Sequence, residues 1–492
     1  MPSTVPPRPE PARRRRLGAL FVMVAIAMDV LDTTIVVVAL PAIEADLGVG
    51  GSALQWIAAS YTLTFALTLV LAGRIGDLLG SKRMILVGMA GFVVASAVCA
   101  FAPTLPMLLA GRVLQAMAGA FILTQGLSIF QSTFPPDERA SVFGMFGAVV
   151  GTSAVLGPLV GGLLLEADLW GLSWRPIFLI NLPIGVITLV GTALLVTAPP
   201  PRGEGGLDLV GVALATTGLL ALVYPLIQGE SAGWPLWTYA SMVAGALLLV
   251  VFLRQQRARV RAGRTPLVLP RLWRERSFVA GLGVILVFLA AFSSMFFVLA
   301  YYLQVGLGFS PLETGLTTLP SALSTVASSI LSARLVARFG PRVLTAGSLA
   351  GVAGLVLLIV TISAAGTGAT GWMLAPALLI TGSGIGLVAA PVIDIILARV
   401  PVTDAGAASG VLNTAEQLGA AAGVAIVGSV FFALAAGDGS GEEIVGSALE
   451  GAILGALWVN VGLMAASAAL TFLLPSGTAP RESVAVPSPT GS

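Results

Sequence analysis

Long apolar segments recur along nearly the whole chain, and short polar stretches separate them. Each segment has about 20 residues or more, and a helix of that length crosses the roughly 30 Å hydrocarbon core of a membrane. The strands of a membrane barrel would instead alternate polar and apolar positions over about ten residues. The pattern therefore predicts an all-α integral membrane protein. We expect fourteen transmembrane helices, near residues 17–41, 53–74, 83–102, 105–130, 141–165, 176–197, 207–227, 236–253, 277–304, 312–334, 342–364, 372–398, 406–435 and 446–473.

The composition supports this prediction. Of the 492 residues, 57% are hydrophobic and only 10% are charged, and the mean hydropathy is +0.99. Such a chain is far too apolar for an ordinary soluble protein. The 59 glycines suit closely packed membrane helices, because small residues let helix backbones approach one another.

The charged residues are distributed asymmetrically. All of the 25 basic residues except Arg112 and Arg175 fall in the tails and in every second loop, whereas acids such as Glu44 and Asp46 occupy the opposite loops. By the positive-inside rule, both termini are cytoplasmic, which requires an even number of spans. We expect the chain in the inner (cytoplasmic) membrane of a bacterium. The apolar run that follows Arg16 is too long for a cleaved signal peptide.

An internal repeat divides the chain. "GRIGDLLGSKR" (73–83) resembles "ARLVARFGPRV" (333–343), and each follows an apolar segment. Two related six-helix halves are a known plan of membrane transporters, with the site between the halves near the midplane. We therefore expect the major facilitator arrangement of two six-helix bundles plus two extra central helices. The expected parts are a cytoplasmic tail (1–16), an N-terminal bundle (17–198), the two additional helices with a cytoplasmic linker (199–276), a C-terminal bundle (277–474) and a disordered tail (475–492).

The arginine-rich stretch 254–276 ends the inserted part. Two interpretations remain open: an amphipathic cytoplasmic helix, or a topology anchor on anionic lipid. We favour the anchor.

Several classes of activity are excluded by missing residue types. Lys82 is the only lysine and lies in "GSKRM", so no phosphate-binding P-loop exists. The chain has no histidine, which rules out zinc peptidase motifs and Ser/His/Asp triads. Cys99 is the only cysteine, so no internal disulfide or cysteine cluster forms. "GTGATG" (366–371) matches a dinucleotide fingerprint, but no strand precedes it. We expect no enzymatic activity, no metal, no nucleic-acid partner and no cofactor other than protons as coupling ion.

Two carboxyls lie inside the first apolar segment. Asp29 and Asp32 are almost one helical turn apart, so they face nearly the same side. Asp32 and Arg112 lie at similar depth, roughly 13 Å and 10 Å from the outer ends of their helices. Because each charge is costly in lipid, mutual pairing across a polar cavity is the economical interpretation. The alternative is that Arg112 caps backbone carbonyls or ties helices together. Without histidine, protons that cross the membrane region must be carried by carboxyls or water.

A third buried carboxyl is expected in the second half. Glu416 lies about 15 Å into its helix, and it shares one face with Asn413 and Gln417. This polar face is a candidate site for a substrate cation or a second proton. The alternative interpretation is that it only forms a hydrogen bond between helices. Asp394, close to Arg399, is expected at the interface without a functional role.

Five stretches in chain order resemble signature motifs of the major facilitator superfamily, specifically of its fourteen-span drug:proton antiporters. They are "LDTTIVVVALPAI", "GRIGDLLGSKR", "GRVLQAMAG", "SAVLGPLVGG" and "WRPIFLINLPIG". The resemblance implies a two-bundle alternating-access fold and export driven by proton entry. It also implies that Asp32 is the motif aspartate of the first helix and Arg112 the motif arginine of the fourth. Asp29 is an addition in this chain.

The same resemblance assigns conformational roles. Asp77, with Gly73 and Gly80 in its motif, is expected to latch one state of the cycle, and the repeat has Ala337 in its place. A second set lets the fifth helix bend and pack tightly at the outer half, after an earlier Gly144: Gly157, Pro158, Gly161 and Gly162.

The chain also departs from the family pattern at several positions: Val37, Ala116, Ala118, Ser153, Pro176, and Glu416, where arginine is common. An acidic residue in place of arginine at Glu416 would reverse the charge preference of the site.

We therefore expect a monomeric proton-coupled antiporter that exports amphipathic, cationic or weakly basic compounds by alternating access. Its partners would be small-molecule substrates and membrane lipids. Asp29, Asp32, Arg112 and Glu416 would couple protons; Asp29, Asp32, Asn413, Glu416 and Gln417 would bind substrate. The alternatives are a dedicated exporter of one endogenous metabolite or antibiotic, and a receptor or scaffold that uses the transporter fold.

Overall fold

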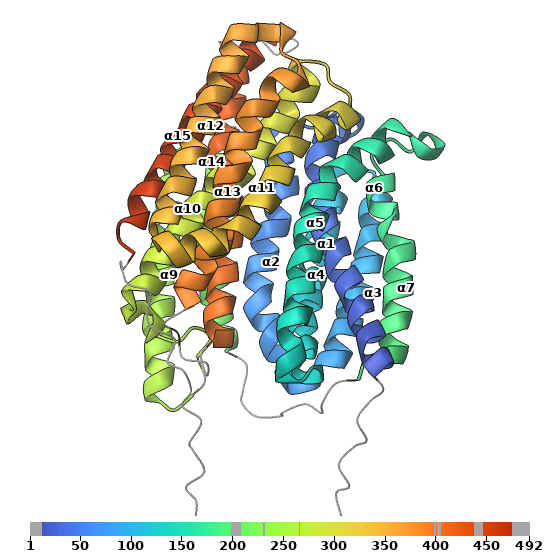
Figure 1. Ribbon diagram of the computed structural model, residues 1–492, viewed down its shortest axis with the longest axis vertical. Helices are drawn as coiled ribbons and strands as arrows, with labels where there is room; N and C mark the ends of the chain where they lie inside the picture. Colours follow the sequence, from blue (N-terminus) through green and yellow to red (C-terminus); the bar gives the residue numbers. More distant parts are fainter. Residues whose placement is uncertain are drawn as a thin grey trace, which may run out of the picture.

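Helices are the only regular elements in the part of the chain that the structure describes (Figure 1). The computed structural model describes residues 12–197, 208–229, 232–264, 266–397, 400, 405–436 and 446–474. The expected disordered tail, most of the expected N-terminal tail and the linker around residues 199–207 lie outside these ranges. So do Arg399 and three acidic residues between positions 436 and 446: Asp438, Glu442 and Glu443.

The helices follow the apolar segments closely. The first seven are α1 (Ala12–Leu47), α2 (Gly51–Leu79), α3 (Ser81–Ala100), α4 (Leu105–Thr133), α5 (Pro136–Glu166), α6 (Pro176–Leu179) and α7 (Asn181–Leu195). Next come α8 (Leu209–Gln228) and α9 (Leu236–Arg261). The remainder are α10 (Arg276–Tyr301), α11 (Pro311–Phe339), α12 (Arg342–Ala365), α13 (Gly371–Leu397), α14 (Ala405–Ala436) and α15 (Gly446–Thr471). Short 3-10 turns occupy Leu169–Gly171, Leu272–Arg274 and Gly366–Gly368, and one π-helical turn occupies Tyr302–Gly306.

The number of helices that meet the length and hydropathy of a membrane span is slightly lower than expected. Within the described ranges, twelve helices qualify, and α2, which bends by 45° between Leu69 and Leu71, makes a thirteenth if its two parts form one span. The expected fourteenth is α11. Its 29 residues are long enough, at about 43 Å, but its many serines and threonines lower its hydropathy. Among the described residues, twelve to thirteen of the fourteen expected spans therefore meet this criterion, and the exact number stays a prediction.

The internal repeat is visible in the backbone. Gly80 ends α2 with φ 94°, and Gly340 ends α11 with φ 63°, at the same offset of 260 residues as the sequence repeat. Glycine tolerates these positive angles without steric cost. Gly80 therefore serves the sharp turn between α2 and α3.

The long helices pack as two groups (Figure 1). We call α1–α7 the first lobe and α10–α15 the second lobe. Within the first lobe, α4 packs against α2 and α3, and α1 against α5 and α7. Within the second lobe, α13 packs against α11 and α12, and α10 against α14 and α15. Helix pairs through which the two lobes meet include α1 with α10 and α11, α2 with α14, and α5 with α11.

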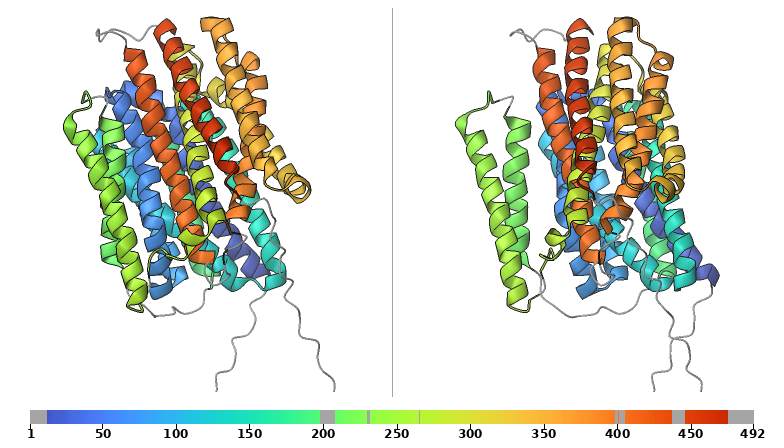
Figure 2. Two further views of the ribbon diagram at one scale, coloured as in Figure 1. Left: turned by 90° about the vertical axis from the view of Figure 1, so that its left-hand side faces the viewer. Right: turned by 60° about the vertical axis from the view of Figure 1, so that its left-hand side comes forward.

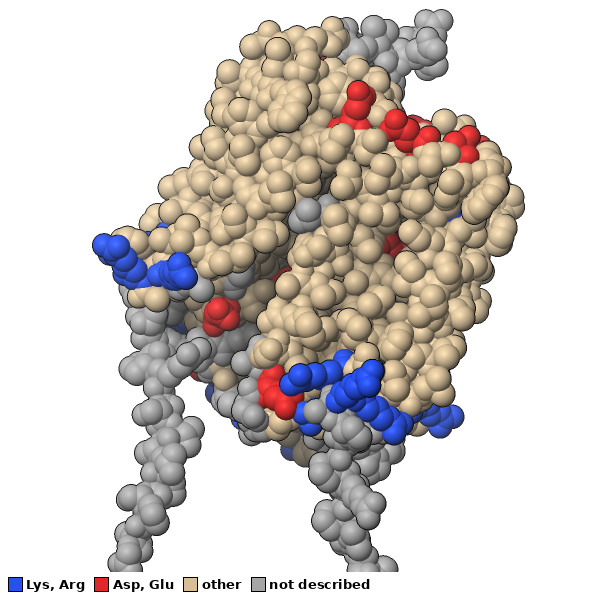
Figure 3. Space-filling model, turned by 45° about the vertical axis from the view of Figure 1, so that its right-hand side comes forward, with Lys and Arg blue, Asp and Glu red and all other residues tan. Residues whose placement is uncertain are grey.

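Charge separates the two ends of the molecule. Figure 3 shows lysine and arginine in the lower half and on the left flank, with a few acidic side chains near them, and a row of acidic side chains along the upper right edge. We call the lower end the basic end and the upper end the acidic end. Glu44, Asp46 and Glu166 lie at the acidic end of α1 and α5, and Arg74, Lys82 and Arg83 at the basic end of α2 and α3.

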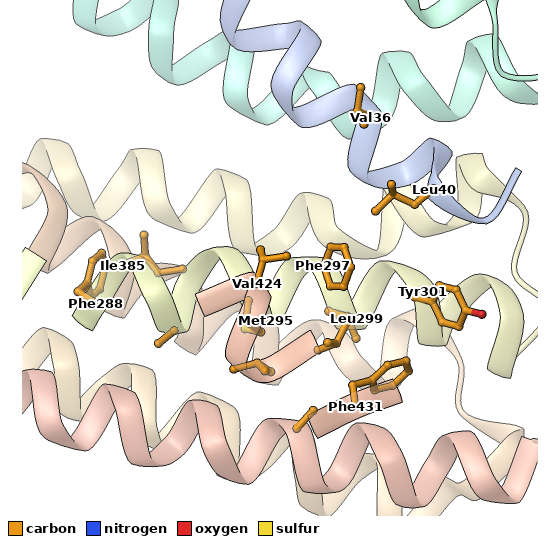
Figure 4. Close-up of a cluster of buried hydrophobic side chains, with 14 of the residues drawn as sticks. Val36, Leu40, Phe288, Met295, Phe297, Leu299, Tyr301, Ile385, Val424 and Phe431 are labelled. Atoms are coloured by element: carbon orange, nitrogen blue, oxygen red, sulfur yellow. The ribbon is translucent and has the colours of Figure 1, made fainter. Parts of the chain in front are cut away.

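The lobes close on each other at the acidic end. The Gln304 side chain donates a hydrogen bond to the Val38 carbonyl across the lobes (2.9 Å). Gly51 lies directly under the ring of Phe432. Deeper contact is made by the Thr414 hydroxyl with the Ala66 carbonyl (3.4 Å), near the middle of α2. Figure 4 shows Val36 and Leu40 of α1 facing the apolar cluster of the second lobe.

Helix α8 lies against one side of the seam between the lobes, and α9 packs on the outer side of α8 (Figure 2). One apolar cluster contains residues of α2, α8 and α14: Ala59, Leu63, Val223, Ile227, Ala421 and Ala425. The Ser429 hydroxyl of α14 donates to the Leu226 carbonyl of α8 (3.1 Å), and the rings of Trp56 and Tyr224 lie 5.7 Å apart. Helix α8 therefore contacts both lobes at once.

A buried polar network fixes the basic end of these two helices. Asp208 is 3% exposed and caps α8 by accepting a hydrogen bond from the Gly211 amide (2.9 Å). It also accepts from the Gln256 side chain (2.7 Å) and pairs with Arg259 (3.3 Å). Gln256 in turn accepts from the Leu267 amide (2.7 Å). The network ties α8, α9 and the following segment together.

The arginine-rich stretch does not form a separate amphipathic helix in its described part. Its first residues continue α9 to Arg261, and residues 266–275 are irregular apart from the 3-10 turn at Leu272–Arg274. The interpretation as an anchor at the lipid surface stays a prediction.

We expect Asp208→Ala to lower the stability of the protein by about 2 kcal/mol, because the change removes a helix cap and leaves buried donors unpaired. Thermal unfolding of purified protein in detergent measures the effect. The matched control is Glu275→Ala, since Glu275 is exposed and its side chain makes no cap hydrogen bond at the start of α10. Equal stability of the two variants would contradict this role of Asp208.

Candidate functional site

A buried ion pair joins α1 to α4 inside the first lobe. The Arg112 guanidinium donates to the Asp32 carboxylate, and both residues are 1% exposed. Two further donors reach the other carboxylate oxygen: the side-chain amides of Asn181 (2.6 Å) and Gln115 (3.1 Å). Asp32 is thus held by one cation and two neutral donors, an arrangement that stabilises a buried carboxylate.

Aromatic rings and polar side chains complete the surroundings of Arg112. The guanidinium lies 4.3 Å from the centre of the Tyr61 ring and 5.8 Å from that of Phe178. Its Nη1 also donates to Gln115 (3.0 Å), but its Nε has no hydrogen-bond partner. A desolvated cation gains from aromatic faces within about 6 Å. The arginine is therefore paired on one side and stacked on the other.

Asp29 lies close to this pair but has a different partner. Its side chain is 4% exposed and accepts a hydrogen bond from the Tyr61 hydroxyl of α2. A Cβ atom on Gly119 of α4 would lie only 2.1 Å from the Asp29 carboxylate. The sequence placed both aspartates on one side of α1, and the structure brings them to one cluster with Arg112.

Sequence reasoning missed several members of this cluster. Asn181 and Gln115 contact Asp32, Ser96 accepts from Gln115 (2.8 Å), and Tyr61 contacts Asp29. Asn181 and Gln115 are uncharged polar residues within the quoted motifs "WRPIFLINLPIG" and "GRVLQAMAG". Their presence in apolar segments was a usable signal.

The third carboxyl lies in the other lobe. Glu416, Asn413 and Gln417 are partly exposed on α14. Asn413 donates to the Ser409 carbonyl of its own helix (2.9 Å). Across the described ranges, no hydrogen bond or ion pair reaches the Glu416 carboxyl, and no printed contact joins it to Asp29 or Asp32. The interhelical hydrogen bond considered for Glu416 is therefore not formed among those residues.

The expected latch lies at the basic end. Asp77 is half-exposed and 3.9 Å from Arg74, one turn earlier on the same helix. Gly73 has open space around it, whereas Gly76 packs against the Gln125 side chain. In this conformation Asp77 is therefore close to an arginine of its own helix.

Glycines of α5 allow close packing against α1 of the same lobe and against α11 of the other lobe. A Cβ on Gly157 would lie 1.8 Å from the Thr34 hydroxyl, and one on Gly161 would lie 3.3 Å from Ile35. A Cβ on Gly162 would lie 2.6 Å from the Pro311 carbonyl of α11. Reciprocally, a Cβ on Gly315 would lie 2.8 Å from the Pro158 carbonyl. Gly144, in contrast, has nothing within 4 Å.

Among the described residues, no group of three or more acidic or cysteine side chains is placed to hold a metal ion. Asp394 is exposed, and its expected neighbour Arg399 lies outside those residues.

Two helical lobes with a seam between them, and a buried charge cluster in helices long and apolar enough to span a membrane, are typical of membrane transporters. The sequence model of the Major Facilitator Superfamily matches residues 22–210 and 206–424, and the chain belongs to this family.

Several curated relatives are described as antibiotic or multidrug transport and resistance proteins. A protein described as "Probable actinorhodin transporter" from Streptomyces coelicolor is 44% identical over 87% of this chain and 74% of its own length. "Puromycin resistance protein pur8" from Streptomyces alboniger is 37% identical over 85% of this chain and 82% of its own length. "Multidrug efflux pump LfrA" from Mycolicibacterium smegmatis is 31% identical over 94% and 90%. The chain is thus an efflux-type transporter of this family.

The fold has a solved counterpart. The crystal structure of a bacterial homologue of the human lysosomal transporter Spinster, in an inward-facing and occupied conformation, aligns with a TM-score of 0.67. It covers 94% of this chain and 97% of that chain, at 17% sequence identity. The likeness extends to the fold alone.

Proposed function

We propose that this protein is a proton-coupled antiporter that exports amphipathic, cationic or weakly basic compounds. It would lie in the inner membrane of a bacterium as a monomer, with both termini and the basic end in the cytoplasm. The observation that carries the proposal is the cluster of Asp29, Asp32 and Arg112, buried in membrane-spanning helices of one lobe. Buried charges in a membrane are costly and mark pathways of ions, protons or substrates.

The two lobes supply the alternating access. Contacts such as Gln304 with Val38 close the acidic end, so the conformation described here suits loading from the basic, cytoplasmic side. An ionised Glu416 on α14, without a charged partner among the described residues, offers a negative group to a cationic compound. After the lobes rock, protons from outside neutralise the carboxyls and weaken that attraction, so the compound leaves.

Two inward protons provide enough driving force for such export. Each proton supplies about 1.4 kcal/mol per pH unit and about 2.3 kcal/mol per 100 mV of membrane potential. The export of one cation against the same potential uses part of this energy, and the rest sustains a concentration gradient.

Reconstitution in liposomes tests the proposal. With an acidic lumen, we expect a permanently charged dye such as ethidium to accumulate inside and the lumen to lose protons at the same time. An ionophore that collapses the pH gradient should abolish both signals, and protein-free liposomes control for passive binding. Dye accumulation without proton movement would contradict proton coupling.

A second candidate is an exporter dedicated to one endogenous antibiotic or metabolite. The relative with 44% identity, described as an actinorhodin transporter, favours this alternative, in which the substrate is neutral or anionic. A panel that contains actinorhodin, puromycin and ethidium separates the two. Transport of a single antibiotic without ethidium supports the dedicated exporter, whereas the absence of any flux would favour a receptor or scaffold.

A further inference from the structure

The hydroxyl and the ring of Tyr61 contact two different members of the charge cluster. The hydroxyl donates to the Asp29 carboxylate, and the ring face lies 4.3 Å from the guanidinium of Arg112. Arg112 in turn donates to Asp32. Among the described residues, a single side chain therefore joins Asp29 to the Arg112–Asp32 pair.

The surroundings of Tyr61 hold it in this position. It is 2% exposed, stacks on Phe65 at 5.9 Å and belongs to an apolar cluster with Ala116 and Ala120 of α4. Gly119 of α4 leaves the space in which the hydroxyl and the carboxylate meet, since a Cβ there would lie 2.8 Å from the hydroxyl. Residues of α1, α2 and α4 thus shape one close contact.

The helix that carries Tyr61 also reaches the other lobe. Five residues later on α2, the Ala66 carbonyl accepts from Thr414 of α14 (3.4 Å). Glu416 lies two residues beyond Thr414 on the same helix. The helix that carries the Asp29–Tyr61 contact therefore also forms part of the interface between the lobes.

We propose that Tyr61 is a positioning residue that couples Asp29 to the Arg112–Asp32 pair, so that the two carboxyls titrate as one unit. This inference rests on the proposed function, because a coupled pair of carboxyls serves a purpose only in a transporter that binds and releases protons. Tyr61 itself carries no proton through the membrane. Its hydroxyl fixes the Asp29 carboxylate, and its ring face stabilises the guanidinium that holds Asp32.

The other elements packed on α1 bring few charges to Asp29. Helices α6 and α7 contain no ionisable residue. The charged residues of α5 are confined to its ends. Those of α10 and α11 also lie towards their ends: Arg276, Tyr301, Glu313, Arg334 and Arg338. The groups that face Asp29 at mid-helix are therefore Tyr61, Asp32 and Arg112.

Infrared titration of ligand-free protein in liposomes tests this coupling. The carboxyl band of each aspartate is assigned by its loss in Asp29→Asn and in Asp32→Asn. We expect Tyr61→Phe, which keeps the ring on Arg112, to shift the midpoint of both bands, that of Asp29 by about one pH unit. Gly119→Ala, which crowds the same contact from α4, should shift the Asp29 band as well.

Tyr239→Phe is the matched control, because it removes a hydroxyl from an exposed tyrosine on α9 and should leave both midpoints unchanged. A Tyr61→Phe protein in which either midpoint equals that of the unmodified protein would overturn the proposal, as would an Asp29→Asn protein that loses no titrating band. The titration needs no substrate or gradient. A failure of proton-coupled export with both shifts present would therefore refute the proposed function and leave the positioning role intact.

Discussion

Asp32→Asn is expected to abolish substrate-driven proton release while the protein still folds. Asparagine has the size of aspartate and keeps one oxygen for the donors Asn181 and Gln115, but it cannot bind and release a proton. It also leaves Arg112 without its buried counter-charge. Loss of one partner of a buried ion pair costs about 3–5 kcal/mol, so we also expect a lower thermal stability.

Proton release on addition of substrate to purified protein, followed with a pH indicator, measures the first effect. Asp46→Asn serves as control, since Asp46 is a carboxylate at the acidic end, paired with Arg175 (2.9 Å) and outside the cluster. Gel filtration in detergent confirms that each variant is folded. Undiminished proton release from folded Asp32→Asn protein would remove Asp32 from the coupling mechanism.

The second large effect is expected from Gly162→Ala, which should open the acidic end. The new methyl group would meet backbone atoms of α11, at 2.6 Å from the Pro311 carbonyl and 2.7 Å from the Leu312 Cα. Backbone cannot yield as a flexible side chain does, so the crowding must separate α5 from α11. Overpacking typically costs about 1–3 kcal/mol, which corresponds to a shift of about 5- to 150-fold in the equilibrium between the two conformations.

Spin labels at Trp170→Cys and Trp372→Cys report the distance between the lobes at the acidic end. Both positions are more than four-fifths exposed, at 82% and 88%, and the native Cys99 is fully buried. We expect a longer distance and at least tenfold slower export in Gly162→Ala. Gly144→Ala, in open space on the same helix, should change neither. An unchanged distance in Gly162→Ala would show that this contact does not hold the acidic end closed.

The helices were predictable from the sequence because the hydropathy and the length of a segment are local properties. The same holds for the positions of Asp29, Asp32 and Arg112, since a charged residue in an apolar segment is visible without any knowledge of its neighbours. Hydropathy alone describes helix α11 less well, because it counts serine and threonine hydroxyls as polar. These hydroxyls can bond to carbonyls of the same helix, as Thr325 does with the Ser321 carbonyl (2.8 Å).

The pairing of Asp32 with Arg112 was predicted from their similar depth, but the other tertiary partners of the carboxyls were not. Asn181 and Tyr61 come from α7 and α2, and only the packing of these helices against α1 and α4 brings them to the carboxyls. Gly119 shows the same limit, because its role is to leave space beside Asp29. A single sequence reports which residues are unusual in their own segment, but not which residues of other helices they meet.

The position of α8 at the seam affects the route by which apolar compounds could pass from the bilayer to the space between the lobes. Two helix pairs flank the boundary between the lobes, α2 with α14 and α5 with α11. On the first flank, α8 covers both helices through Val223 and Ile227. We therefore expect a compound dissolved in the bilayer to be kept from that flank over the length of this cluster, so that sideways entry from the membrane would use the flank of α5 and α11.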